Sequence, residues 1–280
     1  MHRYSRDVPQ SAWFIDGVRK GSNSVEEIVS GAAARSALPC ANLKFHASGR
    51  EDIDVRMLPP EGRPFMLWAQ RCDLTEAALN DPRTCQGIAD AVNAHQGLNI
   101  RGDVSIGDVR RATADEWSAL QKSAEERNKT YLALCWSERA LTLADMAFLS
   151  NKRPFTLSQL TPLRVMHRRS NLNRPREVSN ITATLVNKHW FELRVEVQGG
   201  TYVKEFVHGD LGRTTPSISS LLACRCDILQ LDVESVQMMK GSDVDSLMAS
   251  PGGGGADART AGPAGSRRGR GEGFRDDRRR

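Results

Sequence analysis

Residues 49–56 read Gly-Arg-Glu-Asp-Ile-Asp-Val-Arg, and no other stretch of the chain says more about it. Before it, residues 43–47 (Leu-Lys-Phe-His-Ala) alternate apolar and polar side chains, as a half-buried strand does. Gly49 permits a tight turn after that strand, and three carboxylates then stand between two arginines. By charge pattern alone, such a turn is more often a solvated, self-neutralised loop than a site.

Two later segments supply the other side chains that a carboxylate acting on a nucleobase needs. Residues 129–131 read Lys-Thr-Tyr and begin an apolar, aromatic run, although an aromatic in a strand core is the ordinary interpretation. Residues 200–204 read Gly-Thr-Tyr-Val-Lys, where Tyr202 offers a ring and Lys204 a cation. The ordinary alternative for Lys204 is a surface lysine that lies along apolar neighbours. Taken together, the three segments indicate chemistry on a nucleobase.

A cationic segment at residues 164–176 points to RNA phosphates. It holds five arginines and one histidine, while Glu177 is the only acid close by in sequence. A solvated charge run is the alternative, but such a positive loop on a nearly neutral domain favours phosphate contact. We expect residues 152–176, with three prolines, to form a long loop between strands. The candidate phosphate ligands are Arg164, Arg168 and Arg169.

Composition limits the class of protein. The 280 residues are 39% hydrophobic and 26% charged, which is typical of a globular protein, and no apolar run is long enough to span a membrane. The N-terminus lacks a secretory signal, so we interpret the six cysteines as reduced thiols of an intracellular protein. No Cys-x-x-Cys pair occurs, and His46 alone cannot complete a metal site at the acidic turn, so we expect no metal.

The C-terminal segment differs in composition from the rest. Residues 251–280 hold eight arginines against four acids, which gives +4 of the total charge of +5. Glycine-rich and almost without aromatic residues, residues 249–280 are predicted to be a disordered Arg/Gly-rich tail that adds RNA affinity or simply solubility. Residues 1–248 are predicted to form one α/β or α+β domain.

Hydrophobic periodicity predicts the main elements of that domain. The segment at 84–95 has helical spacing, and a capping box predicts a helix over 113–127. Thr201 is expected to cap a short helix through Phe206. His208 and Asp210 are given a structural role, because no nucleophile pattern accompanies them. The expected strands lie at 43–47, 64–68, 104–109, 131–136, 181–186, 191–197 and 226–236.

With these segments assembled, the chain resembles the pseudouridine synthases. Residues 49–52 are similar to the Gly-Arg-x-Asp motif that carries the nucleophile of that superfamily. Residues 129–131 are similar to its second motif, and residues 200–204 to the Gly-Thr-Tyr-Ile-Arg segment of the TruB branch. Longer strings at 49–58, 161–169 and 200–214 resemble the archaeal and eukaryotic "Pus-ten" tRNA pseudouridine synthases. The resemblance covers about residues 4–240.

The resemblance implies an α+β fold, a mixed and mostly antiparallel sheet flanked by helices. Asp52 would be the nucleophile, Tyr131 would stack on the target base, and Lys204 would pair with Asp52 and keep it ionised. Tyr202 would share the cleft, and Leu221 would form an apolar wall. Glu51 and Asp54 are expected to point elsewhere or to pair with Arg50 or Arg56.

The resemblance also implies the substrate. In the family, uridine 54 and uridine 55 of the tRNA T-arm become pseudouridine without a cofactor or metal, and attack at the sugar or at the ring both stay open. We expect a monomer in the nucleus, the cytoplasm or both. The family carries a THUMP-containing domain with paired zinc-binding cysteines, and this chain is expected to start after it. Residues 59–83 follow the family pattern only loosely. A silent RNA-binding or RNA-chaperone protein that retains the cleft is the alternative.

Overall fold

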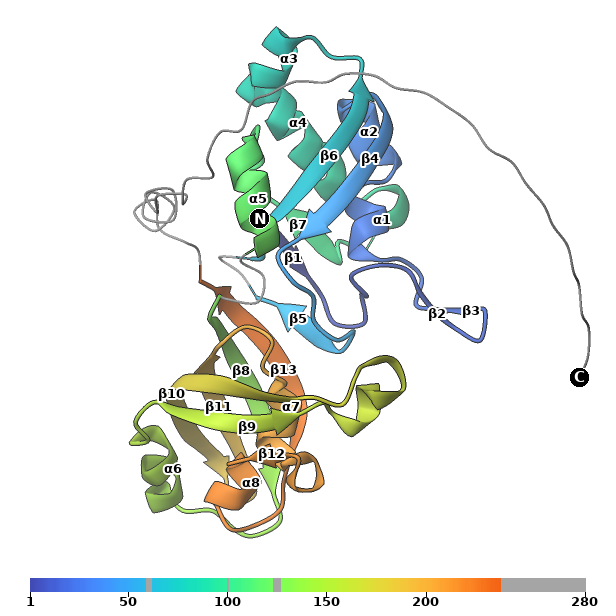
Figure 1. Ribbon diagram of the computed structural model, residues 1–280. Helices are drawn as coiled ribbons and strands as arrows, with labels where there is room; N and C mark the ends of the chain where they lie inside the picture. The colour runs from blue at the N-terminus through green and yellow to red at the C-terminus, as the bar shows by residue number, and fades with distance from the viewer. Residues whose placement is uncertain (59–61, 100, 123–126, 238–280) are drawn as a thin grey trace, which may run out of the picture. The chain divides into compact units, whose positions relative to one another are not determined.

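The computed structural model describes residues 1–58, 62–99, 101–122 and 127–237 (Figure 1). The first strands are β1 (His2–Tyr4), β2 (Trp13–Ile15), β3 (Val18–Lys20), β4 (Cys40–Ala47), β5 (Val55–Met57), β6 (Phe65–Cys72) and β7 (Val104–Ile106). The later strands are β8 (Lys129–Ser137), β9 (Phe155–Leu160), β10 (Asn173–Asn187), β11 (Trp190–Val197), β12 (Thr214–Thr215) and β13 (Cys226–Val236).

Short helices connect these strands. The α-helices are α1 (Val25–Val29), α2 (Ala32–Ala37), α3 (Glu76–Asn80), α4 (Pro82–Asn93), α5 (Ala114–Lys122), α6 (Leu143–Ser150), α7 (Val203–His208) and α8 (Ile218–Leu221). The 3₁₀ segments are η1 (Gly97–Asn99), η2 (Leu163–Arg168) and η3 (Asp210–Gly212). No helix among the described residues is long and apolar enough to cross a membrane.

One large sheet organises the described chain. Its nine strands run in the order β12-β9-β10-β11-β8-β13-β5-β1-β7, and β2-β3 and β4-β6 form two separate ribbons. All of the pairings in the large sheet are antiparallel except that of β13 with β5. The expected α+β architecture, a mixed and mostly antiparallel sheet with helices, is confirmed. The predicted tail at 249–280 lies outside the described residues.

Strand β8 lies at the centre of the sheet and carries one of the site motifs. Alternate side chains from Lys129 to Ser137 are buried, which is the period of two that a strand with one face in the core requires. Tyr131 lies opposite Val195 of β11 and Val233 of β13. Because all of these positions face the core, a slip of one residue would expose the whole set, so the register of β8 is strongly specified.

The helices begin at polar caps and bury one apolar face. Thr142 and Asp145 form a reciprocal capping box at the start of α6, which lies against β10 (Figure 1). Helix α4 begins with Asp81 as its cap and a proline at its first position, and it buries Ile88 and Val92. Most strand predictions and the helices at 84–95 and 113–127 therefore find counterparts, although α5 is described only to Lys122.

Two local predictions are wrong. Residues 152–176 are not a long loop, because they contain β9, η2 and the start of β10. Thr201 does not cap α7: its hydroxyl donates to the carbonyl of Gln198 instead, and the cap residue is Tyr202, which makes no side-chain capping bond. A compact turn takes the place of the expected cap.

Candidate active site

The turn between β4 and β5 presents Asp52. Gly49 has a φ of +81°, in the left-handed region that favours glycine, and an added Cβ would lie 3.1 Å from Nη1 of Arg63 and 3.5 Å from Nζ of Lys129. The turn therefore packs its backbone closely onto two cations. The side chain of Asp52 is 33% exposed, so its carboxylate is accessible to a ligand.

Two cations from different elements meet the carboxylate of Asp52. Nη1 of Arg164, in η2, lies 2.9 Å from Oδ2, and Nζ of Lys204, in α7, lies 3.4 Å from the same oxygen. Lys204 is nearer to Asp54, whose two carboxylate oxygens accept hydrogen bonds from its Nζ at 2.6 and 2.7 Å. Lys204 thus lies within ion-pair range of the predicted nucleophile but binds Asp54 more closely.

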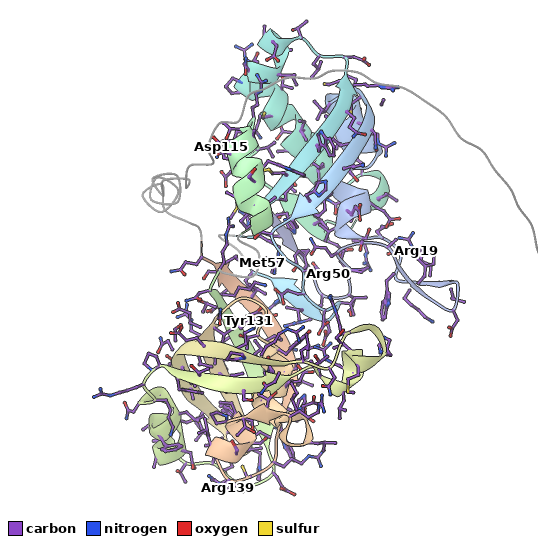
Figure 2. All side chains as sticks on the ribbon, in the orientation of Figure 1. Arg19, Arg50, Met57, Asp115, Tyr131 and Arg139 are labelled. Atoms are coloured by element: carbon purple, nitrogen blue, oxygen red, sulfur yellow. The ribbon has the colours of Figure 1, made fainter. Side chains whose placement is uncertain are left out.

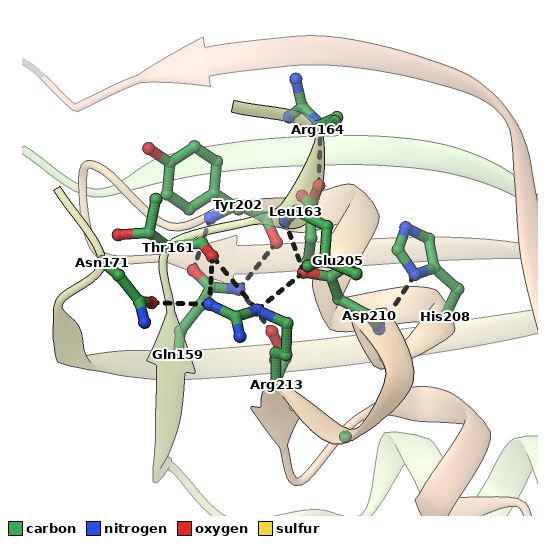
Figure 3. Close-up of polar contacts among 12 residues, drawn as sticks. Gln159, Thr161, Leu163, Arg164, Asn171, Tyr202, Glu205, His208, Asp210 and Arg213 are labelled. Carbon is green, nitrogen blue, oxygen red and sulfur yellow. Dashed lines mark hydrogen bonds and ion pairs between the residues drawn. The ribbon is translucent and has the colours of Figure 1, made fainter. Parts of the chain in front are cut away.

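Arg164 connects Asp52 with a buried acid. Its Nε donates a hydrogen bond of 2.7 Å to Oε1 of Glu205, a residue that is only 1% exposed (Figure 3). Partial burial acts to lower the pKa of Arg164, but the hydrogen bond and attraction of Glu205 and the charge of Asp52 outweigh it and raise that pKa. The guanidinium carbon lies 5.9 Å from the centre of the Tyr202 ring. Arg164 is therefore part of the site itself.

Below the turn lies a buried charge cluster centred on Glu51. Its Oε1 accepts hydrogen bonds from Nη2 of Arg63 at 2.6 Å and from Nζ of Lys129 at 2.9 Å. The hydroxyl of Tyr131 lies 3.2 Å from both carboxylate oxygens. Burial acts to raise the pKa of Glu51, but the attraction of Lys129 and Arg63 prevails and lowers it to about 2. Glu51 is thus a structural anion rather than an acid–base group.

The two cations of this cluster, Arg63 and Lys129, are also buried. The side chain of Arg63 is fully buried, and its Nη1 donates to the carbonyl of Ser48 at 2.8 Å, which holds the start of the turn. Burial lowers the pKa of Lys129, and nearby Glu51 opposes that shift. Burial, reinforced by the charge of Glu51, raises the pKa of the Tyr131 hydroxyl well above its usual value. That hydroxyl therefore stays protonated and donates its hydrogen bond to Glu51.

Tyr131, Tyr202 and Leu221 are buried to different degrees. Tyr131 is 3% exposed, whereas Tyr202 is half-buried and has its backbone held by Gln159, which accepts from the Tyr202 N–H at 2.8 Å and donates to its carbonyl at 3.0 Å (Figure 3). Leu221, in α8, is half-buried against the main core. The stacking and wall roles assigned to these residues stay predictions.

The arginines expected to bind phosphate divide into two kinds. Arg164 turns inward to Asp52 and Glu205, whereas Arg169 is exposed just after η2. The side chain of Arg168 lies outside the part of the chain that the structure describes. Of the two described side chains, Arg169 is the one open to solvent as expected, and its contact with phosphate stays a prediction.

Glu51 and Asp54 have partners that the local charge pattern does not indicate. The suggested partners Arg50 and Arg56 are not the ones found: Arg56 binds Asp232 at 2.9 Å, and Arg50 is exposed. Glu51 does point away from the partners of Asp52, but Asp54 shares Lys204 with it.

Comparison with known proteins decides the family. The family model described as "Pus10, C-terminal" matches residues 1–237. The chain belongs to the Pus10 C-terminal family. Within the residues that the structure describes, no group of three or more His, Cys, Asp or Glu side chains is arranged to hold a metal ion.

Curated relatives in this Pus10 family come from animals and archaea. The chain is 38% identical over 238 residues to "tRNA pseudouridine synthase Pus10" of Homo sapiens, covering 85% of this chain and 43% of the human protein. It is 37% identical over 238 residues to the protein of the same name from Xenopus laevis, covering 85% and 44%. The namesake from Methanosphaera stadtmanae is 34% identical over 248 residues, covering 83% and 57%. The chain thus spans about half the length of these relatives.

Among solved structures, a chain of the "Crystal Structure of a Cbf5-Nop10-Gar1 Complex" matches 75% of this chain and 44% of its own length. It is 16% identical, with a TM-score of 0.43.

Glu205 and Arg63 of this Pus10-family chain escaped the sequence analysis, and so did the structural role of Glu51. Glu205 directly follows Lys204, Glu51 precedes Asp52, and Arg63 lies in a Gly-Arg-Pro stretch. Glu205 and Arg63 are almost fully buried and the side chain of Glu51 is 12% exposed, and burial of a charge cannot be seen in a single sequence. Adjacency to a motif residue is a signal for Glu51 and Glu205, and Arg63 lacks even that.

Proposed function

We propose that this chain is the catalytic part of a tRNA pseudouridine synthase, with Asp52 as the nucleophile. The observation that carries the proposal is the partly exposed carboxylate of Asp52, held by Arg164 and Lys204 in a chain of the Pus10 C-terminal family. The matched relatives are named as tRNA pseudouridine synthases, and tRNA is therefore the substrate we propose. Both cations contact Oδ2, and the partly exposed carboxylate stays within reach of a ligand.

The proposed reaction is an isomerisation that balances without a co-reactant. The bond between N1 of uracil and C1′ of ribose breaks, and a bond between C5 and C1′ forms. The proton on C5 is lost, and N1 gains a proton. Asp52 begins the sequence by attack at the sugar or at the ring, and it leaves unchanged at the end.

The target nucleotide has to leave its stack to reach Asp52. Unstacking costs a few kcal/mol, and stacking on an aromatic side chain returns about 1–3 kcal/mol. We assign that stacking to Tyr131, with Tyr202 in the same cleft and Leu221 as an apolar wall. The target we propose lies in the T-arm, at uridine 54, at uridine 55 or at both.

The test is incubation of the full chain with an unmodified tRNA transcript, followed by pseudouridine mapping at single-nucleotide resolution. Product at one or both T-arm uridines supports the proposal and shows which position is used. Tight binding of tRNA with no product would instead favour the RNA-binding or RNA-chaperone alternative. Product at uridines outside the T-arm would keep the reaction and overturn the proposed target.

A further inference from the structure

Arg164 is the cation that comes nearest to the predicted nucleophile. Its Nη1 is 2.9 Å from Oδ2 of Asp52, whereas Nζ of Lys204 is 3.4 Å away. Lys204 also binds both oxygens of Asp54, at 2.6 and 2.7 Å. An ammonium is a compact point charge, and here its shortest contacts go to a different carboxylate. The orientation of Asp52 therefore depends on Arg164 at least as much as on the lysine of the recognised motif.

Glu205 explains why Arg164 turns inward. The carboxylate is nearly fully buried, Oε1 accepts from Nε of Arg164 at 2.7 Å, and Oε2 has no hydrogen-bond partner among the described residues. A buried carboxylate left without a counter-charge is strongly destabilising. Glu205 therefore holds the Nε edge of Arg164 and leaves the Nη atoms to reach Asp52.

The base of η2 is held in the same place by a second set of contacts. The N–H of Leu163 donates to Oδ2 of Asp210 at 3.1 Å, and the Nη2 atom of Arg213 donates to the carbonyl of Thr161 at 2.8 Å (Figure 3). Leu163 and Thr161 both lie just before Arg164 in the sequence. The segment that carries Arg164 is thus fixed against the region that follows α7, which limits how far the guanidinium can move away from Asp52.

From these contacts we infer that Glu205 is a positioning residue, which holds Arg164 so that its guanidinium sets the orientation of the Asp52 carboxylate through Oδ2. The inference rests on the proposed isomerase function and adds a second, arginine-based support for the nucleophile. Helix α7 then supplies one cation directly, through Lys204, and positions the other through the adjacent Glu205. A guanidinium suits this task, because its planar fork directs Nε to Glu205 and Nη1 to Asp52 in a fixed relative geometry.

The test compares five proteins in single-turnover reactions with saturating unmodified tRNA, together with separate tRNA-binding measurements. The variants are Arg164→Lys, Arg164→Met, Glu205→Gln and the double variant Arg164→Met with Glu205→Gln, beside the unmodified chain. We expect each single variant to lower the rate by about 10- to 100-fold, with the dissociation constant for tRNA changed less than about threefold. The lysine variant should be as slow as the methionine variant, since it keeps the charge but loses the fork.

The double variant separates positioning from a merely structural role. If Glu205 acts through Arg164, the double variant is no slower than Arg164→Met alone, because residues that act as one unit are not additive. Additive losses would overturn the inference. Should Glu205→Gln fail to fold, Arg164→Lys still decides: its side chain is 38% exposed, and a rate equal to that of the unmodified chain would overturn the inference.

Controls distinguish this inference from its alternatives. Arg194, which pairs with Glu234 at 2.5 Å on the sheet, is the matched arginine, and Arg194→Met should leave rate and binding unchanged. If Arg164→Met instead raised the dissociation constant and lowered its salt dependence with no loss of rate, Arg164 would be a phosphate ligand and the inference would fall. If the unmodified chain formed no pseudouridine, the proposed function would fail first, and the inference with it.

Discussion

The hydroxyl of Tyr131 lies 3.2 Å from both carboxylate oxygens of Glu51, the residue that precedes the predicted nucleophile. This contact joins the turn after β4 to the central strand β8, which are far apart in the sequence. Because Lys129 and Arg63 share the same carboxylate, charge-assisted hydrogen bonds hold the turn in addition to its backbone hydrogen bonds. The turn that carries Asp52 and the Lys-Thr-Tyr segment of β8 are therefore linked through the carboxylate of Glu51.

Exchange of each aspartate in the turn tests which one is the nucleophile. Asp52→Asn should abolish pseudouridine formation and leave tRNA binding within a few-fold, because an amide keeps the shape but cannot attack. Asp54→Asn should keep measurable activity, since it removes only the nearer partner of Lys204. Both variants are measured by pseudouridine mapping and by tRNA binding. Activity that survives in Asp52→Asn and disappears in Asp54→Asn would show that the motif has been placed in the wrong register.

Glu51→Gln should destabilise the fold strongly at neutral pH. The variant leaves the buried Arg63 and Lys129 without their counter-charge, and loss of one partner of a buried pair typically costs about 3–5 kcal/mol. A shift of the Glu51 pKa from 4.5 to about 2 corresponds to roughly 3 kcal/mol, which agrees in order of magnitude. The free energy of unfolding from urea titrations measures the effect.

The pH dependence of that stability has a defined sign. The folded-state pKa of Glu51 lies below its unfolded value, so its contribution is fully present above about pH 4.5 and is lost as the pH falls towards 2. Glu51→Gln should abolish this part of the acid dependence. Glu116 is the matched control: its pKa is also about 2, through a hydrogen bond from Arg110, but it lies on the surface. Screening by solvent should limit the cost of Glu116→Gln to about 1 kcal/mol or less.

Much of the sheet could be predicted from periodicity, but several of its shortest strands could not. The expected strand at 226–236 coincides with β13, because eleven residues carry a clear pattern. Strands β1 and β5 have three residues each, which is too few to show a hydrophobic period. The turn that carries Asp52 nevertheless lies directly before β5. The long loop expected at 152–176 is inferred from its three prolines, which are uncommon in helices and central strands. In the structure two of them lie on either side of β9 and the third lies within β10.

The candidate site likewise has a part that the sequence predicts and a part that only the fold decides. Asp52, Tyr131 and Lys204 could be proposed as candidates because they lie in the three motifs. The partner of Arg164 could not, since Glu205 is 41 residues away in the sequence and is brought near only by the folded sheet. Nor could the sequence show that Lys204 would bind Asp54 more closely than Asp52. Which of several neighbouring charges a side chain binds depends on side-chain geometry. The spacing of residues in the sequence does not reveal that geometry.

Tyr131 should act through its ring rather than through its hydroxyl. Tyr131→Phe keeps a surface on which a base can stack, and it should retain most of the single-turnover rate. Loss of its hydrogen bond to the charged Glu51 should cost about 1.5–3 kcal/mol of stability. Tyr131→Ala should lose the stacking energy and most of the rate, measured under the same conditions with saturating tRNA. Equal damage from the two variants would assign the role to the hydroxyl, and therefore to the link with Glu51.

Arg168 and Arg169, where η2 ends, should bind RNA phosphates. Their combined replacement by Met should therefore weaken binding of every tRNA tested. With each phosphate contact that is lost, binding releases fewer counterions, and the log–log slope of affinity against salt should therefore fall by about 0.7–0.9 per contact.

Arg153 is exposed just before β9, away from η2, and Arg153→Met is the control that should leave the slope unchanged. Binding is measured between about 50 and 200 mM salt, and the rate at saturating tRNA is measured in parallel. Because these contacts supply uniform binding, KM should rise while kcat stays nearly constant. A slope identical to that of the unmodified chain would show that these arginines belong to an ordinary solvated charge run.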